Sequence, residues 1–384
     1  MNIQTLSAED TAASHRAPSG ILVNGRFLSQ RTSGVQRFAR ELVKAVDAQL
    51  AITPPEQRGA PWTLLMPAGV QCDLDLRCIK TRQAGFGRGH LWDQSLHFVG
   101  RRGDVLVNLA NSGPIWRSRN LVVIHDATVY RTPGNFTRAY AWLHQTLGHL
   151  LAMRANLATV SQFSRREIAE ILGVDAKRIP VVLNSCEHLR DVPADTGVLQ
   201  RLGVTPQRYF VFLSSPAPNK NLVTALRAHA ELRKRLAAAG AEPTQLVIIG
   251  AVDRAVFGDG PGEMPEGAVL AGPVDDRAVK ALLQDASALV FPSLYEGFGI
   301  PPLEAMLAGC PVIASDIPPV REVCGDAALR VPPTDTAAMA EAMWQLQTEP
   351  ALRTTMIERG KAQSGLYAWS SSARALRDAI AQIG

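Results

Sequence analysis

The segment 293–315, SLYEGFGIPPLEAMLAGCPVIAS, constrains the fold more than any other part of this chain. It follows the short apolar run 288–292, which is typical of a buried strand. Pro301 and Pro302 are tolerated only in the first turn of a helix, so we predict a helix over residues 303–308. The segment therefore encodes a strand, a glycine-rich loop and a helix.

A helix that begins after such a loop suits an anionic ligand that carries a sugar. Its unpaired backbone N–H groups and the positive end of its dipole attract a diphosphate, and Gly297 and Gly299 allow a close approach. Glu304 lies too near that end to contact phosphate without repulsion, so we expect it to bind a hydroxyl such as a ribose edge. Glu296 would face the reacting part of the ligand. Taken alone, the same residues also fit a tight turn and a first-turn acid with structural roles only.

The string EGFGIPPLEAMLAGCPVIASDIPPVREVCGDAA, from Glu296 onward, resembles the signature of the family-four glycosyltransferases, which retain the anomeric configuration. The resemblance implies the GT-B fold, an α/β fold in which two Rossmann-like, doubly wound domains face each other across a cleft. It also implies that the second domain binds a nucleotide-sugar donor and the first domain binds the acceptor. The donor-binding residues that we predict on this basis are Gly34, Ser215, Asn219, Pro273, Val274, Gly297, Phe298, Gly299, Ile300, Leu303 and Glu304.

The chain of 384 residues is long enough for two domains that each bury a core. Two series of alternating strands and helices, separated by a polar stretch at 191–203, predict two parallel sheets. We predict an acceptor-binding domain over 21–200 and a nucleotide-sugar-binding domain over 201–364. In the first series the predicted strands cover 21–28, 62–66, 105–109, 121–125, 157–161 and 180–183.

The two ends of the chain carry separate predictions. Residues 1–20 are polar and lack the apolar core of a signal peptide, so we predict a disordered N-terminus. Residues 365–384 carry a helical pattern, and the family resemblance implies that this last helix crosses back to the first domain. No stretch approaches the length of a transmembrane span, so any membrane contact would be peripheral.

Charge and cysteine content exclude several classes of protein. The net charge is +5 and the pI about 9.1, but dense Lys/Arg tracts with interleaved aromatic residues are missing, which argues against nucleic acid as a partner. Five cysteines without a CxxC pair argue against a disulfide framework or a zinc site and favour a reducing, cytoplasmic compartment. A group of basic residues in the first half would face either solvent or an anionic membrane: Arg77, Lys80, Arg82, Arg88, Arg101 and Arg102.

Lys220 follows the first strand of the second domain, where it can reach a phosphate as a point charge. The segment SSPAPNKNL resembles the family's segment with a phosphate-binding lysine at this position. Many family members also carry an arginine nearby, where this chain has Ser214 and Ser215 or Asn219. Leaving-group stabilisation would therefore depend on Lys220 and backbone N–H groups, without a metal ion.

Three further segments of the first half carry candidate residues. His125 and Asp126 end the apolar run LVVIHD, and family members with this pair place the histidine near the donor sugar; Asp126 would either orient the imidazole or touch the acceptor. Gly34, in TSGVQRF, lies where the family has a loop against the diphosphate. The segment HLWDQ at 90–94 resembles a Trp-Glu-Gln element of some relatives, and helix packing accounts for it equally well.

These residues predict a retaining, metal-independent hexosyltransferase with Glu296, Lys220, His125 and Asp126 as the catalytic group. Resemblance favours mannose from GDP-mannose as the donor sugar. It favours a saccharide acceptor, lipid-linked, in polysaccharide or lipopolysaccharide synthesis at the inner face of the cytoplasmic membrane. The alternatives are a UDP- or dTDP-sugar donor, or a nucleotide-sugar-binding protein without turnover. A Rossmann oxidoreductase is disfavoured because a dinucleotide-binding glycine fingerprint is missing.

Overall fold

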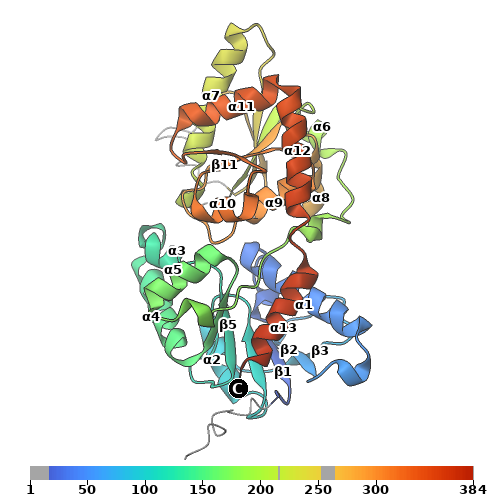
Figure 1. Ribbon diagram of the computed structural model, residues 1–384, viewed down its shortest axis with the longest axis vertical. Helices are drawn as coiled ribbons and strands as arrows, with labels where there is room; N and C mark the ends of the chain where they lie inside the picture. Colours follow the sequence, from blue (N-terminus) through green and yellow to red (C-terminus); the bar gives the residue numbers. More distant parts are fainter. Residues whose placement is uncertain (1–16, 215–216, 252–263, 384) are drawn as a thin grey trace, which may run out of the picture.

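The computed structural model describes residues 17–214, 217–251 and 264–383, and these form two parallel six-stranded sheets (Figure 1). The strand order is β3-β2-β1-β4-β5-β6 in the first sheet and β12-β11-β10-β7-β8-β9 in the second. Both follow the doubly wound order, in which the chain starts near the middle of the sheet and winds toward each edge in turn. The predicted fold class is therefore confirmed.

The first domain is built around a sheet whose central strands are fully buried. Its strands are β1 (Ile21–Asn24), β2 (Trp62–Met66), β3 (Lys80–Gln83), β4 (Val105–Asn108), β5 (Asn120–Ile124) and β6 (Asn156–Thr159). Its helices are α1 (Gly34–Ile52), α2 (Gly89–Ser95), α3 (Thr128–Arg131), α4 (Arg138–Arg154) and α5 (Gln162–Leu172).

The second domain repeats this architecture. Its strands are β7 (Tyr209–Ser214), β8 (Gln245–Gly250), β9 (Ala268–Gly272), β10 (Ala288–Phe291), β11 (Val312–Ser315) and β12 (Leu329–Val331). The helices of this half are α6 (Val198–Leu202), α7 (Leu222–Ala238), α8 (Asp276–Gln284), α9 (Ile300–Leu307), α10 (Pro318–Cys324), α11 (Thr336–Thr348), α12 (Pro350–Ser364) and α13 (Trp369–Ala381).

One predicted strand of the first sheet is wrong, and one observed strand was missed. Residues 180–183 form no strand, because only Val181 bridges to Thr159, and the ring nitrogen of Pro180 cannot donate to a ladder. The edge strand β3 was not predicted, because all four of its residues are exposed and it has no buried face to impose an alternating pattern.

The last helix, α13, lies against α1 in the first domain, as Figure 1 shows for the red and blue helices. The side chain of Gln49 in α1 donates to the carbonyl oxygen of Ser370 at 2.6 Å, and Arg119 donates to the carbonyl oxygen of Ile383 at 2.8 Å. The chain therefore crosses between the two domains twice.

Residues around the first strand extend the first domain toward the N-terminus. Residues 1–16 of the segment predicted to be disordered lie outside the described residues. Ser19 donates its hydroxyl to Asp104 at 2.8 Å, and the N–H of Val105 donates to the carbonyl oxygen of Gly20. The ordered first domain thus begins before Ile21.

Candidate active site

The carboxyl ends of the two sheets meet at the junction between the domains, and the loop after β7 carries the predicted lysine. This loop is held by Asn221, whose φ of 58° places it in the left-handed region and whose amide donates to the carbonyl oxygens of Pro292 and Pro333. Asn219 donates to the carbonyl oxygen of Tyr295 at 3.0 Å. These bonds tie the loop after β7 to the loop after β10. Ser215 lies outside the described residues.

Lys220 and Glu296 form an ion pair, with Nζ donating to Oε1 at 2.5 Å. The Lys220 side chain is 21 % exposed and that of Glu296 is 12 % exposed, so the pair is reachable yet poorly screened. The ammonium also lies 5.5 Å from the centre of the Phe291 ring. The structure therefore brings together two residues that are 76 positions apart in the chain. A diphosphate at this place would compete with Glu296 for the ammonium group.

The start of α9 offers fewer backbone donors than the sequence prediction required. Pro301 and Pro302 occupy its first turn and carry no N–H, so these two positions cannot donate a backbone hydrogen bond to a phosphate. Gly299 has a φ of 99°, which favours glycine, and it caps the helix. Helix α9 can therefore supply part of the charge stabilisation, and Lys220 must supply more.

Two residues predicted to bind the donor, one of them through its backbone N–H, have side chains in the hydrophobic core. Phe298 is 4 % exposed and packs edge-on against the ring of Tyr367, with centroids 5.7 Å apart. Leu303 is completely buried. A ligand could meet these two residues only through their backbone, so side-chain contact with the donor is excluded in this conformation.

Gly297 joins the two domains. Its carbonyl oxygen accepts hydrogen bonds from the hydroxyls of Ser161 at 2.6 Å and Ser164 at 2.9 Å. A Cβ atom at this position would lie 2.4 Å from the carbonyl oxygen of His125 and 2.7 Å from Cβ of Asp126. The glycine thus allows the loop before α9 to lie against first-domain backbone. We expected it to allow a close approach of the ligand instead.

His125 is buried under this contact and is held in one tautomer. Its Nε2 lies 2.9 Å from the carbonyl oxygen of Leu109, which can only accept, so Nε2 carries the proton. Burial lowers the pKa of His125, and the bond to Leu109 and the charge of Asp126 only partly oppose that effect. The imidazole is therefore neutral at pH 7, and its Nδ1 can accept a hydrogen bond from a sugar hydroxyl.

Asp126 forms a hydrogen bond within its own loop. One of its oxygens, Oδ1, accepts from the N–H of Thr128 at 2.8 Å at the start of α3. Its second oxygen is not needed for that bond. Of the two predicted roles for Asp126, contact with the acceptor fits this arrangement better than orientation of the imidazole.

Glu304 contacts a histidine that the sequence analysis did not select. Nε2 of His188, in the segment that leaves the first domain, donates to Oε1 of Glu304 at 2.9 Å. Both side chains are nearly buried, at 3 % and 12 % exposed, and Nδ1 of His188 is buried without a hydrogen-bond partner. One carboxylate oxygen of Glu304 is thus already in use, and the other can accept from a hydroxyl.

The remaining predicted donor residues lie around the same junction. A Cβ atom on Gly34, the first residue of α1, would contact Ile300 of α9 at 3.7 Å. Arg37, one turn further, makes a bidentate pair with Asp276 at the start of α8, with both distances 2.7 Å. Pro273 is exposed and Val274 half-buried on the connection that leads into α8.

A buried polar network lies at the carboxyl edge of the first sheet, and sequence reasoning did not identify it. Asp93 of α2 is completely buried and accepts from Asn24 at 3.0 Å and from Ser112 at 2.6 Å. Arg26, just after β1, places its Nε 3.3 Å from the same carboxylate. Nδ1 of His90 lies 3.0 Å from the hydroxyl of Ser112. The 90–94 segment is therefore part of this polar edge as well as a packed helix.

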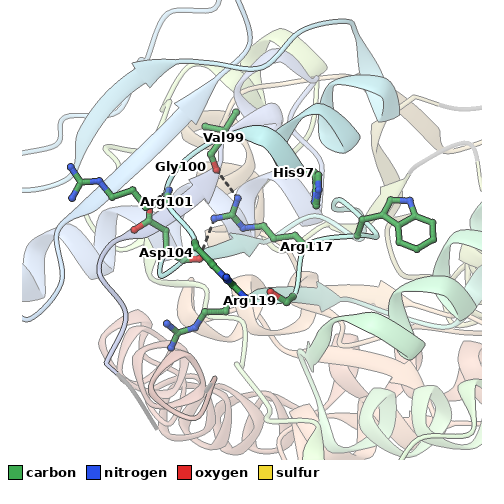
Figure 2. Close-up of a pocket in the computed structure, with 10 residues that line it drawn as sticks. His97, Val99, Gly100, Arg101, Asp104, Arg117 and Arg119 are labelled. Carbon is green, nitrogen blue, oxygen red and sulfur yellow. Dashed lines mark hydrogen bonds between the residues drawn. The ribbon is translucent and has the colours of Figure 1, made fainter.

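The pocket drawn in Figure 2 lies at the opposite, amino edge of the first sheet, away from these residues. Arg117 crosses it and donates to the carbonyl oxygens of Leu96, Val99 and Asp104. Burial lowers the pKa of this guanidinium, and its donors are used to hold the loop before β4. We therefore interpret the pocket as a structural feature. Arg101 and Arg102, which belong to the predicted basic group, lie at its rim.

The part of the chain that the structure describes contains no group of three or more His, Cys, Asp or Glu side chains arranged to hold a metal ion.

Comparison with known proteins bears on the family. The family described as glycosyl transferases group 1 matches residues 200–363, which include Lys220, Glu296 and Glu304. The second domain of this chain therefore matches the group 1 glycosyltransferases, as the predicted resemblance implied. The assignment as an enzyme that transfers a glycosyl group is thereby confirmed.

Relatives of this glycosyltransferase include the O-antigen chain mannosyltransferase B of Escherichia coli, which is 29 % identical over 66 % of this chain and 68 % of the relative. The phosphatidyl-myo-inositol mannosyltransferase of Mycobacterium leprae is 33 % identical over 55 % of this chain and 54 % of the relative. This glycosyltransferase thus aligns with about half to two thirds of each relative's length.

The structure of WaaG, a glycosyltransferase involved in lipopolysaccharide biosynthesis, superposes with a TM-score of 0.68 at 15 % identity, covering 94 % of this chain and 99 % of that one. A structure of Anabaena Alr3699/HepE in complex with UDP and glucose gives a TM-score of 0.65 at 15 % identity, with 94 % and 98 % covered. At this identity the likeness establishes the fold of this glycosyltransferase, and it extends through both domains.

Proposed function

We propose that this glycosyltransferase transfers a hexose, with mannose from GDP-mannose as the first candidate, to a saccharide acceptor and without a metal ion. The observation that carries the proposal is the Lys220–Glu296 pair at the domain junction, within the matched family region. Mannose is favoured because relatives from three different genera are named as mannosyltransferases. A lipid-linked acceptor in polysaccharide or lipopolysaccharide synthesis follows the names of the O-antigen relatives.

The chemistry requires negative charge to develop on the departing nucleoside diphosphate while positive charge develops on the sugar ring. Lys220 would bind the departing group, and the start of α9 would add the N–H groups that its prolines leave. Released from the ammonium group, Glu296 would then lie free to position the sugar and stabilise its cationic character. Retention would follow if the acceptor attacks from the face that the diphosphate leaves, with the diphosphate taking the acceptor proton.

His125 would contact the donor sugar. Its Nδ1 is unprotonated because Nε2 is committed to Leu109, so it would accept a hydrogen bond from a sugar hydroxyl. Gly297 lies directly over its backbone, so closure of the two domains would complete this contact and exclude water.

A thermal-shift panel tests the donor. A ligand that binds only the folded chain raises its melting temperature, so GDP should give a larger shift than UDP or dTDP. Radiolabelled GDP-mannose should then release its nucleoside diphosphate in the presence of acceptor. A larger shift with UDP or dTDP would indicate that the donor is a UDP- or dTDP-sugar instead of GDP-mannose. Binding without release of the nucleoside diphosphate, whatever the acceptor, would favour a nucleotide-sugar-binding protein.

We also propose peripheral contact with an anionic membrane at the inner face of the cytoplasmic membrane, supported by α4. This helix carries Arg138 and Arg154 but no acidic residue. Its exposed apolar side chains include Trp142 at 68 % and Met153 at 73 % exposed. Helices with basic residues and an exposed apolar face lie in membrane interfaces. Among the described residues, no helix combines the length and apolar character needed to cross a membrane.

Vesicle sedimentation tests this contact. We expect the chain to sediment with vesicles that contain phosphatidylglycerol and to lose at least half of that binding in a Trp142→Ser, Met153→Ser variant. The matched control is Ile52→Ser, because Ile52 is also highly exposed but lies at the end of α1. Equal binding by the wild-type chain, the double variant and the control would indicate that the predicted basic group around β3 makes the contact instead.

A further inference from the structure

Four aromatic rings form a continuous row at the polar edge of the first domain. Phe136 stacks on Tyr140 with centroids 5.2 Å apart and planes 14° from parallel. Tyr140 lies 4.1 Å from His144, and His144 meets His90 edge-on at 5.0 Å. The first three recur at every fourth residue, so they share one side of α4 and its approach. None of the four is fully buried, and Tyr140 is 46 % exposed.

The row lies beside residues of the predicted active site. The carboxylate of Asp126 is close enough to Tyr140 to help raise the pKa of its phenol, after the larger effect of burial. Arg26 acts on the same phenol in the opposite direction. Tyr140, the second ring of the row, therefore lies near the residue that follows His125.

Buried groups fix the other end of the row. The carboxylate of Asp93 forms an ion pair with Arg26 and accepts hydrogen bonds from Asn24 and Ser112. Ser112 in turn contacts Nδ1 of His90. Asn24 also donates to Asn108 at 2.9 Å, which anchors the network to β1 and β4. Building such a network costs desolvation that a merely solvated helix face would avoid. Its effect is to hold Arg26 and His90 in fixed orientations at the sheet edge.

We propose that the row Phe136, Tyr140, His144 and His90, together with Arg26, is the subsite that receives a neutral saccharide unit of the acceptor. The proposal rests on the proposed glycosyl transfer. The exposed edges of these stacked rings offer apolar contact to a sugar ring, while phenol, imidazole and guanidinium groups bind its hydroxyls. Asp93 is the positioning residue of this subsite.

The charges around the row favour a neutral ligand over an anionic one. Arg26, which lies near Tyr140 and His144, is already paired with the buried Asp93 carboxylate. Burial lowers the pKa of His144, and neighbouring His90 and Arg26 lower it further, so His144 is neutral at pH 7. Asp126 adds a negative charge on the donor side. Little net positive charge is left to attract a phosphate or carboxylate.

Histidine-selective NMR locates the ligand directly. The chain has eight histidines, so ¹³C-labelled imidazole gives few signals, and single His→Ala variants assign them. The probe is methyl α-D-mannopyranoside, added to the full chain with GDP present. We expect the signals of His90 and His144 to shift along one saturable curve. His149, on the same helix but next to Tyr130, should stay in place.

Variants then separate the subsite from general packing. Tyr140→Ala should weaken the binding of the probe at least tenfold, whereas His149→Ala should leave it within twofold. Both variants should keep the wild-type thermal shift with GDP. No shift of His90 and His144, or equal shifts of His149, would overturn the proposal. Equal affinity in Tyr140→Ala would overturn it as well.

Failure of the proposed function gives a different pattern. In that case the wild-type chain would release no nucleoside diphosphate from any sugar nucleotide, whatever the NMR titration shows. Saccharide binding at the row without turnover would thus remove the proposed transfer and keep a saccharide site. Turnover without any effect of the saccharide on the signals of His90 and His144 would remove the proposed subsite and keep the proposed transfer.

Discussion

The proposed donor side and the proposed acceptor side of the junction are built in different ways. On the proposed donor side, Lys220 and Glu296 stand on loops that follow β7 and β10, two neighbouring strands of one sheet. On the proposed acceptor side, Arg26, His90 and Tyr140 come from a 3-10 helix and two α-helices, and a buried carboxylate connects Arg26 with His90 through Ser112. We therefore expect the donor side to depend most on its charges and the acceptor side to depend most on its buried network.

Removal of the charge on the donor side should have the largest effect. Lys220→Ala should lower kcat about 10²- to 10³-fold, roughly 3 to 4 kcal/mol of barrier, by analogy with a lost oxyanion-hole donor. Steady-state kinetics with a sugar nucleotide measures it. Lys234→Ala is the control, because Lys234 is 77 % exposed on α7. A loss below tenfold would mean that other groups carry the departing phosphate.

Disturbing the contact between the two sides should have the next largest effect. Gly297→Ala places a methyl group against the carbonyl oxygen of His125, so the loop must shift. We expect kcat/KM to fall about 30-fold, ~2 kcal/mol. Gly134→Ala is the control, since a Cβ there meets nothing within 4 Å. Full activity in Gly297→Ala would show that turnover does not need this closed contact.

Breaking the buried network should affect the acceptor alone. Asp93→Asn replaces an acceptor oxygen by an amide and leaves the Arg26 charge uncompensated, so we expect the KM for acceptor to rise about tenfold, ~1.4 kcal/mol, with kcat kept. Asp73→Asn is the control, because that carboxylate is 64 % exposed and its pair with Arg40 should contribute little. An equal fall in kcat would indicate a loss of folding instead.

The smallest effect should come from the support of Glu304. His188→Ala removes the bond to Oε1 and leaves the carboxylate less well oriented, so the affinity for GDP should fall about threefold, ~0.7 kcal/mol. Isothermal titration calorimetry measures it, with His97→Ala as a control at the amino edge of the first sheet. Tighter binding in His188→Ala would show that this histidine competes with the nucleotide for Glu304.

Local patterns predicted much of the donor side, because strand, loop, prolines and helix follow one another within about 25 residues of chain. The same patterns did not reveal that the side chains of Phe298 and Leu303 belong to the core, because the packing of the loop and of the helix against the sheet decides which way a side chain faces. His188 carried no local signal, since its partner Glu304 lies 116 positions away. Asp93 stood in a segment whose spacing fitted a packed helix equally well.

By itself the sequence determined the two doubly wound sheets, the glycine-rich loop before α9 and the two glutamates on either side of it, because these depend on short-range periodicity and on backbone limits of proline and glycine. Only the tertiary structure decided which charges meet. The pairing of Lys220 with Glu296, of His188 with Glu304 and of Arg26 with Asp93 depends on loops and helices from distant parts of the chain converging at the sheet edges. No pattern along the chain encodes that convergence.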